Sequence, residues 1–266
     1  MASRAERSMS FGTIATDYDR LRPSPPEAAI DWLLPANCQV AVDLGAGTGL
    51  LSRALARQVP RVVAVEPDER MAAVLQDRSP GVEVVPGRGE AIPLPDASAD
   101  GVFISSAWHW MDPELAVPEI ARVLRDGGRF GLIWTSRDRE VGWVRELNRL
   151  REPDWAARTE EPDDRGRPRA RHRDITLPDT APFGTAEIAE FAFQREMTVG
   201  DFVAMLGTYS GVITASPQER EAALARVRTA LQERFPGADE IDVPMRSLCW
   251  RADRLPRPGW RVPDPD

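Results

Sequence analysis

The chain contains no lysine, and all 34 of its basic residues are arginine. A phosphate-binding loop of the Gly-Lys-Ser/Thr type needs a lysine to reach the phosphates, so nucleoside-triphosphate chemistry of that kind is excluded. Cysteine and histidine are also scarce, with two of each, and Cys38 and Cys249 lie far apart in the sequence. Disulfide frameworks and zinc clusters need more of these residues at closer spacing, so we expect neither a disulfide nor a bound metal.

Long apolar runs are lacking as well. No stretch reaches the roughly eighteen apolar residues of a membrane span, and the first residues, MASRAERSMSFG, have no apolar core of a signal peptide. The net charge of −8 opposes binding to a phosphate backbone. We therefore expect a cytoplasmic monomer or homodimer that acts on a small molecule and binds neither nucleic acid nor a membrane.

What the sequence does have is an alternation of β-branched runs with helical stretches between about residues 39 and 134. This pattern is typical of βα units around a parallel sheet. Strands are predicted at 40–44, 61–66, 82–85, 100–105 and 129–134, and helices at about 50–58, 68–77 and 113–125. Two later runs, 186–199 and 242–253, alternate like a pair of antiparallel strands. Between them, Ser216 and Glu219 predict a capping box at the start of a helix.

The composition divides the chain into an N-terminal segment (1–38), a main domain (39–255) and a proline-rich tail (256–266) that we expect to be disordered. Within the main domain, residues 152–182 are charged and rich in proline, which predicts a long polar insertion. Arginines alternate through this insertion at Arg165, Arg167, Arg169, Arg171 and Arg173. Such a charge run is usually a solvated loop, and the alternative is a lid that admits an anionic substrate.

A glycine-rich turn follows the first predicted strand, in the sequence VDLGAGTG. It places an acid, Asp43, before three alternate glycines, Gly45, Gly47 and Gly49, at the strand end where open α/β sheets bind ligands. Glycine is favoured where the backbone turns tightly or approaches a ligand closely. A dinucleotide-binding turn has its third glycine three residues after the second, whereas here the step from Gly47 to Gly49 is two residues.

This turn resembles the first motif of the class I S-adenosylmethionine-dependent methyltransferases, an acid followed by x-Gly-x-Gly-x-Gly. The stretches GRGEAIPLPDASADGVFISSAWHWMD and EIARVLRDGGRFGLIW resemble the type 11 methyltransferase domain, and more narrowly its trans-aconitate methyltransferase-like branch. The resemblance is specific over about residues 11–135. It implies a Rossmann-like α/β fold with a mostly parallel seven-stranded sheet, helices on both faces and an antiparallel edge strand.

The resemblance also implies a set of residues that bind S-adenosylmethionine. The glycine backbone lies beneath the amino-acid end of the cofactor, and the carboxylates of Asp43 and Glu66 suit its ammonium group and its ribose hydroxyls. The N-terminal stretch FGTIATDYDRLRPSPP resembles a segment laid over the cofactor, in which Arg22 meets the carboxylate of the cofactor or of the substrate. The full predicted set is Tyr18, Arg22, Asp43, Gly45, Ala46, Gly47, Gly49, Glu66, Pro67, Gly89, Glu90 and Ser105.

One departure from the family concerns the adenine ring. Many relatives carry an aspartate at the position of Arg88 to bind the adenine amino group. Without that acid, recognition of adenine is assigned to Gly89, to Glu90 or to apolar packing.

The residues after the fourth strand, 105–110, are expected to face the transferred methyl group. They lack the Asn/Asp-Pro-Pro-aromatic motif of amino methyltransferases, and neither cysteine is near enough to serve as the nucleophile of a cytosine methyltransferase. His109 is the one candidate general base, because its pKa is naturally close to neutrality. The alternative for His109 is that its imidazole only orders the loop. Trp108 and Trp110 either pack in the core or stack on a substrate.

These observations favour methyl transfer to an oxygen atom of a small metabolite. A carboxylate is one candidate acceptor, because it attacks without losing a proton. An NAD(P)-dependent oxidoreductase is the first alternative, and the glycine spacing and the absence of a Tyr-x-x-x-Lys pair disfavour it. A non-catalytic module that only binds the cofactor is the second, and the motif does not exclude it.

Overall fold

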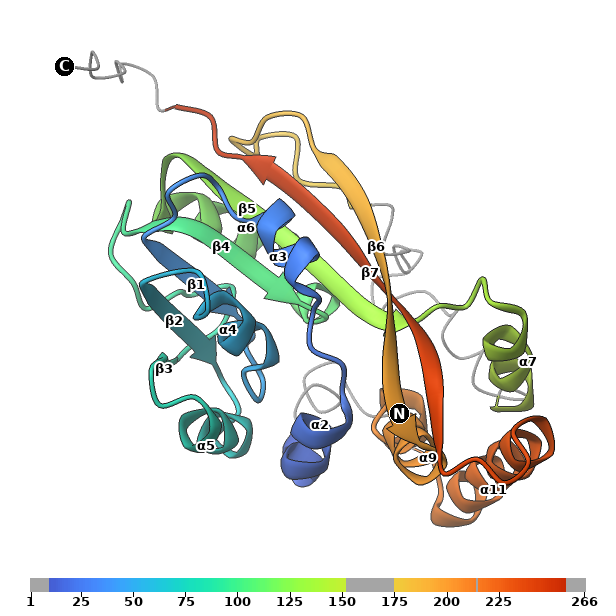
Figure 1. The fold of residues 1–266 in the computed structure, drawn as a ribbon. Helices are drawn as coiled ribbons and strands as arrows, with labels where there is room; N and C mark the ends of the chain where they lie inside the picture. The colour runs from blue at the N-terminus through green and yellow to red at the C-terminus, as the bar shows by residue number, and fades with distance from the viewer. Residues whose placement is uncertain (1–9, 152–174, 214, 257–266) are drawn as a thin grey trace.

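One seven-stranded sheet runs through the computed structural model, which describes residues 10–151, 175–213 and 215–256 (Figure 1). The strand order is β3-β2-β1-β4-β5-β7-β6. The strands are β1 (Val40–Leu44), β2 (Arg61–Glu66), β3 (Glu83–Pro86), β4 (Ala99–Ser105), β5 (Leu124–Arg137), β6 (Glu187–Thr198) and β7 (Glu240–Asp253).

The pairing of these strands confirms the expected Rossmann-like α/β fold. All neighbours from β3 to β5 are parallel, whereas β7 runs antiparallel to both β5 and β6. The antiparallel strand therefore lies one place inside the sheet, and β6 forms the edge. Parallel strands need crossover connections, which the helices after β1, β2 and β4 provide.

The helices of the parallel half match their predicted positions to within a few residues: α4 (Leu50–Leu55), α5 (Glu69–Arg78) and α6 (Pro113–Val123). The remaining elements are η1 (Ser10–Ile14), α2 (Ala15–Leu21), α3 (Glu27–Leu33), η2 (Trp108–Trp110), α7 (Gly142–Arg151), α9 (Val199–Gly207), α10 (Ser210–Ile213) and α11 (Pro217–Arg234). Ser216 and Glu219 form the predicted capping box at the start of α11.

Two apolar layers cover the two faces of the sheet. On one face, Ile104 and Leu132 pack with Ile120 of α6. On the other, Phe103 and Ile133 pack with residues of α3 and α4, among them Leu33. Because successive side chains of a strand point to opposite faces, the continuous apolar runs of β4 and β5 serve both layers.

A third apolar cluster joins the C-terminal helices to the end of β6 and the start of β7. It contains Phe202 and Leu206 of α9, Leu231 of α11 and Val243 of β7. Figure 1 shows α9 and α11 gathered at this end, with α2 beside α9. The C-terminal helices are therefore packed near the carboxyl ends of the parallel strands, where the glycine-rich turn lies.

Several predictions lie outside the described residues. They are the five alternating arginines, the part of the insertion before residue 175, and the tail from residue 257. Within the described part of the chain, no helix has the length and apolar character that crossing a membrane requires.

Candidate functional site

The glycine-rich turn connects β1 to α4, and all three of its glycines adopt left-handed backbone conformations. Their φ angles are +70° at Gly45, +58° at Gly47 and +85° at Gly49. Residues with a side chain rarely adopt these angles, so the motif supplies glycine where the backbone requires it. The amides of Gly45 and Ala46 donate to the carbonyl of Val65 at 2.8 and 3.2 Å, which ties the turn to β2.

The turn is also covered so closely that side chains would not fit at two of the glycines. A Cβ atom at Gly45 would lie 2.9 Å from Cβ of Ala107, and one at Gly49 would lie 2.7 Å from Cγ of Leu75. At Gly47 the nearest atom, Cε of Met71, would be 3.5 Å away, an ordinary contact. The segment after β4 therefore packs directly on the turn.

Asp43, at the end of β1, is fully buried. Its Oδ2 accepts a hydrogen bond from Oγ of Ser52 at 2.6 Å, whereas its Oδ1 is buried without a hydrogen-bond partner. Burial raises the pKa of this carboxyl to about 7, although the Ser52 hydrogen bond acts in the opposite direction. An unsatisfied buried carboxylate oxygen is costly, and a neighbouring cation offsets that cost. The site therefore fits a ligand with an ammonium group.

Glu66 ends β2 and faces the same turn. Its Oε2 accepts from the amide of Gly47 at 2.7 Å, and its Oε1 accepts from the amide of Asp68 at 2.9 Å. Burial raises the pKa of Glu66, and these two hydrogen bonds partly counter the shift. Each carboxylate oxygen keeps a second lone pair, so the residue can still accept from ribose hydroxyls. Pro67, which follows it, is exposed.

The chain turns sharply after Ser105, the last residue of β4. Ser106 has a φ of +54°, a rare conformation for a residue other than glycine, and its amide donates to the carbonyl of Ile133 at 2.9 Å. Such strained positions occur often at functional sites. The turn brings Ala107 over Gly45 and starts η2, which carries the two tryptophans and His109.

The two tryptophans of η2 have different surroundings. Trp108 is buried, and its ring centroid lies 5.5 Å from that of Phe130 in the core. Trp110 is half-buried and faces the ring of Phe11 in the N-terminal segment at 6.2 Å. His109 is exposed, and its ring lies 4.5 Å from that of Trp110. Trp108 is thus a packing residue, while Trp110 and His109 lie between the loop after β4 and the N-terminal segment.

The N-terminal segment lies against the helix that follows the glycine turn. Asp19 of α2 pairs with Arg53 of α4 at 2.5 Å, and Arg53 also donates to the carbonyl of Thr48 at 2.9 Å. Tyr18 lies on the same short helix, with its ring 5.7 Å from that of Phe11. That this segment covers a cofactor stays a prediction.

Met111 is a residue of the site that sequence reasoning missed. It is buried, and its side chain would touch a Cβ at both Gly45 (3.2 Å) and Gly89 (2.6 Å). The neighbouring amide of Asp112 donates to Oε1 of Glu90 at 2.9 Å. Glu90 therefore holds the loop after β4, and its role in adenine binding stays a prediction. The only signal for Met111 in the sequence is its place directly after the Trp-His-Trp stretch.

Arg22, at the end of α2, meets residues from the C-terminal half of the chain. Its Nη2 donates to the carbonyl of Thr208 at 3.2 Å, and its Cζ lies 3.8 Å from the ring centroid of Tyr209. Arg137, the last residue of β5, reaches the same ring at 5.0 Å. Sequence reasoning named Arg22 but neither Tyr209 nor Arg137, because both come from distant segments without a motif.

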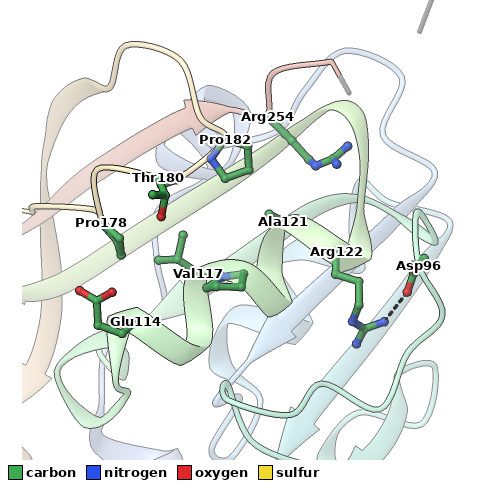
Figure 2. Close-up of a pocket in the computed structure, with 11 residues that line it drawn as sticks. Asp96, Glu114, Val117, Ala121, Arg122, Pro178, Thr180, Pro182 and Arg254 are labelled. Atoms are coloured by element: carbon green, nitrogen blue, oxygen red, sulfur yellow. Dashed lines mark hydrogen bonds and ion pairs between the residues drawn. The ribbon is translucent and has the colours of Figure 1, made fainter. Parts of the chain in front are cut away.

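A groove elsewhere on the molecule lies between α6 and the segment from Pro178 to Pro182 (Figure 2). Of the charged side chains that line it, Arg122 pairs with Asp96 at 2.9 Å and Arg254 pairs with Asp126. No residue of the glycine turn lines this groove. We therefore place the candidate site at the glycine turn.

In the described residues, no cluster of three or more histidine, cysteine, aspartate or glutamate side chains is suited to a metal ion.

Comparison with known proteins agrees with this placement. Residues 42–132 match the family model of a methyltransferase domain. An uncharacterised methyltransferase of Mycobacterium tuberculosis is 40% identical over 94% of this chain and 98% of its own length. A malonyl-[acyl-carrier protein] O-methyltransferase of Methylococcus capsulatus is 36% identical, but over only 46% of this chain and 48% of its own.

A solved structure, described as a type II methyltransferase from Anaeromyxobacter dehalogenans, has a TM-score of 0.67 and 28% identity, covering 89% of this chain and 99% of that one. These comparisons agree with the observed fold and leave the trans-aconitate branch undecided. The chain belongs to the class I S-adenosylmethionine-dependent methyltransferases.

Proposed function

We propose that this protein binds S-adenosylmethionine at the glycine turn and transfers its methyl group to an oxygen of a small molecule, with carboxylates as the acceptor class. The observation that carries the proposal is the buried Oδ1 of Asp43, which has no hydrogen-bond partner beside a turn of three left-handed glycines. The O-methyltransferase named among the partial relatives supports oxygen as the acceptor atom.

When bound, the cofactor would supply an electrophilic methyl group on its sulfonium sulfur to the acceptor oxygen and would leave as the neutral thioether. The protein's part is positioning and exclusion of water. Asp43 accepts from the ammonium group, Glu66 accepts from the ribose, and Met111 covers the turn from the side of β4. The other residues predicted to contact the cofactor also remain part of this proposal. They are Tyr18, Arg22, Gly45, Ala46, Gly47, Gly49, Pro67, Gly89, Glu90 and Ser105.

His109 has a defined role only for some acceptors. A carboxylate attacks as an anion and needs no base, whereas a phenol or alcohol must lose a proton. His109 is exposed and lies against Trp110, so it is open to a substrate that enters beside η2. We expect His109→Gln to leave carboxylate methylation within about threefold of wild type and to slow hydroxyl methylation by about 100-fold.

The test is a transfer assay with S-adenosylmethionine labelled in its methyl group and a panel of small carboxylic acids, phenols and amines. Methyl esters release labelled methanol in mild alkali, whereas N-methyl, C-methyl and ether products retain the label. We expect alkali-labile product from an acid and none from amines, with Asp43→Asn as the inactive control. Alkali-stable product alone would contradict carboxylate methylation. Cofactor binding without any transfer would instead support a non-catalytic module.

A further inference from the structure

Arg53 of α4 joins the glycine turn to the N-terminal segment through a single guanidinium group. Its Nη1 donates to the carbonyl of Thr48 at 2.9 Å and to Oγ of Ser79, directly after α5, at 3.2 Å. Its Nη2 donates to Oδ1 of Asp19 of α2 at 2.5 Å. One side chain therefore contacts three segments that are separate in sequence: the glycine turn, the end of α5, and α2.

The contact with Thr48 acts inside the glycine turn itself. Thr48 is buried between Gly47 and Gly49, which both have positive φ angles, and its own hydroxyl has no hydrogen-bond partner in the described residues. Glycine backbone is conformationally free, so hydrogen bonds to the backbone are needed to keep it in one shape. The amide of Gly47 donates to Glu66, and Arg53 holds the peptide group that joins Thr48 to Gly49.

The contact with Asp19 ties the same guanidinium to α2. Both side chains are partly shielded from water, so salt screens this ion pair less than a surface pair. α2 has a second polar attachment, because Arg20 pairs with Asp201 of α9, the helix that Figure 1 shows beside it. A change at Asp19 therefore removes the connection of α2 to the glycine turn and leaves its connection to α9.

The two contacts of Arg53 support one another. An arginine side chain loses rotamer freedom when it is fixed, and its guanidinium group is planar and rigid. When Asp19 holds one nitrogen, the other nitrogen is already aimed at the Thr48 carbonyl, so the loss of freedom is shared by both contacts. Undocking of α2 would free the guanidinium and loosen the glycine turn. The reverse also holds, because coupling between two equilibria is reciprocal.

We propose that Arg53 is a positioning residue that couples the docking of α2 to the shape of the glycine turn, so that the turn binds its cofactor most tightly while Asp19 holds the guanidinium. The N-terminal segment then acts on the cofactor through the turn, whether or not it also touches the cofactor. The inference rests on the proposed function, since the cofactor of that function is the ligand whose affinity is coupled.

The first arm measures the affinity for S-adenosylhomocysteine by calorimetry, without turnover. Arg53→Gln and Asp19→Asn should each weaken binding about fivefold or more, the size usual for coupling between sites. Arg53→Lys keeps the charge but loses the planar fork, so it should retain part of the affinity. Arg57→Gln and Asp17→Asn are the matched controls and should bind like wild type. Both residues are exposed, and they follow or precede the tested residues on the same segments.

A merely structural role of Arg53 would give a different result. Loss of this ion pair removes only a small part of the stability of a folded domain, so every variant is fully folded well below its melting temperature. Lower stability alone therefore leaves the measured affinity unchanged. Circular dichroism and thermal melting check each variant. Equal affinity of Arg53→Gln and Asp19→Asn with their controls would overturn the proposal.

The second arm tests the reverse direction of the coupling by limited digestion with trypsin. Trypsin cleaves after arginine, and the bond after Arg20 lies within α2, so its cleavage requires local opening of that helix. Mass spectrometry follows this cleavage with and without saturating S-adenosylhomocysteine. The ratio of the two rates is compared, so that an effect of a substitution on the bond itself cancels. The cofactor should slow cleavage in wild type and both controls, and about fivefold less in Arg53→Gln and Asp19→Asn.

The two arms together separate the possible outcomes. Weaker binding by Arg53→Gln, with the same protection at Arg20 as in wild type, would mean that Arg53 acts on the turn alone, and it would overturn the coupling. No binding of S-adenosylhomocysteine to wild type would overturn the proposed function and the inference with it. The predicted changes in affinity and protection, in a protein that forms no methylated product, would support the coupling and contradict the proposed methyl transfer.

Discussion

At the scale of single residues, Asp43 makes the sharpest prediction, because its carboxyl is fully buried and its pKa is raised to about 7. An unfolded aspartate titrates near pH 4. The folded, cofactor-free protein therefore binds an extra proton between about pH 4 and pH 7. The stabilisation from protonated Asp43 is complete below about pH 4 and is lost as the pH rises through about 7. We expect Asp43→Asn to flatten this fall in thermal stability.

The measurement is the melting temperature of wild type and Asp43→Asn at half-unit steps from pH 5 to pH 8, without cofactor. Wild type should lose stability relative to the variant over this range. Parallel curves would contradict the assignment of the proton to Asp43. Because a bound ammonium group favours the ionised carboxylate, cofactor binding near pH 7 should also release protons, which calorimetry in two buffers of different ionisation enthalpy detects.

Gly45 makes a second prediction at this scale. Alanine there would hold a φ of +70° and place its Cβ 2.9 Å from that of Ala107. We expect Gly45→Ala to cost about 1–3 kcal/mol in the free energy of unfolding and to weaken cofactor binding. Urea denaturation and cofactor titration measure the two effects. Gly81→Ala is the control, since Gly81 has no positive φ and no atom within 4 Å of an added Cβ. Equal effects at both positions would refute the argument from the turn.

Residue-level prediction from the sequence succeeded where a local motif existed. The glycines and Asp43 lie within seven consecutive residues, and their spacing alone indicated the turn. Met111, Tyr209 and Arg137 were missed, because each reaches the site through tertiary packing from a different segment. Nothing local distinguishes Arg137 from the other 33 arginines of the chain.

At the scale of elements, the ion pair between Asp19 and Arg53 fastens α2 to α4. The two side chains are 14% and 26% exposed, so they are screened less than a surface pair. We expect a double-mutant cycle with Asp19→Asn and Arg53→Gln to give a coupling energy of about 1 kcal/mol in unfolding. The exposed pair of Arg61 and Glu83, which joins β2 to β3, is the matched control and should give about 0.3 kcal/mol. A smaller coupling for Asp19 and Arg53 than for the control would contradict the claim that this ion pair fastens α2 to α4.

Element boundaries show what periodicity can predict and what it cannot. The strand predicted at 129–134 is observed as β5, Leu124–Arg137. Its apolar centre was recognisable, but its polar end, from Thr135 to Arg137, is a strand because it pairs with Ser247, Arg246 and Met245 of β7. That partner is more than 100 residues away, so only the fold reveals the extension. The same extension places Arg137 beside the ring of Tyr209.

At the scale of the whole molecule, the candidate cofactor contacts come from the N-terminal segment, from β1 and β2, and from the loop after β4. The unfolded chain does not bring these segments together, so the cofactor binds the folded state alone. Ligand at 100 times its dissociation constant then stabilises the protein by about 2.7 kcal/mol. For a chain of 266 residues this corresponds to a rise in melting temperature of about 5–10 °C.

We expect S-adenosylhomocysteine to produce this rise in wild type and in Gly81→Ala, and Asp43→Asn to reduce it. NADH at the same concentration should produce none, because the turn lacks the glycine spacing of a dinucleotide site. Differential scanning fluorimetry with both ligands measures the two shifts side by side. A rise with NADH and none with S-adenosylhomocysteine would contradict the cofactor assignment for this chain. It would also contradict the proposal that Oδ1 of Asp43, which is buried without a hydrogen-bond partner, accepts from the ammonium group of the cofactor.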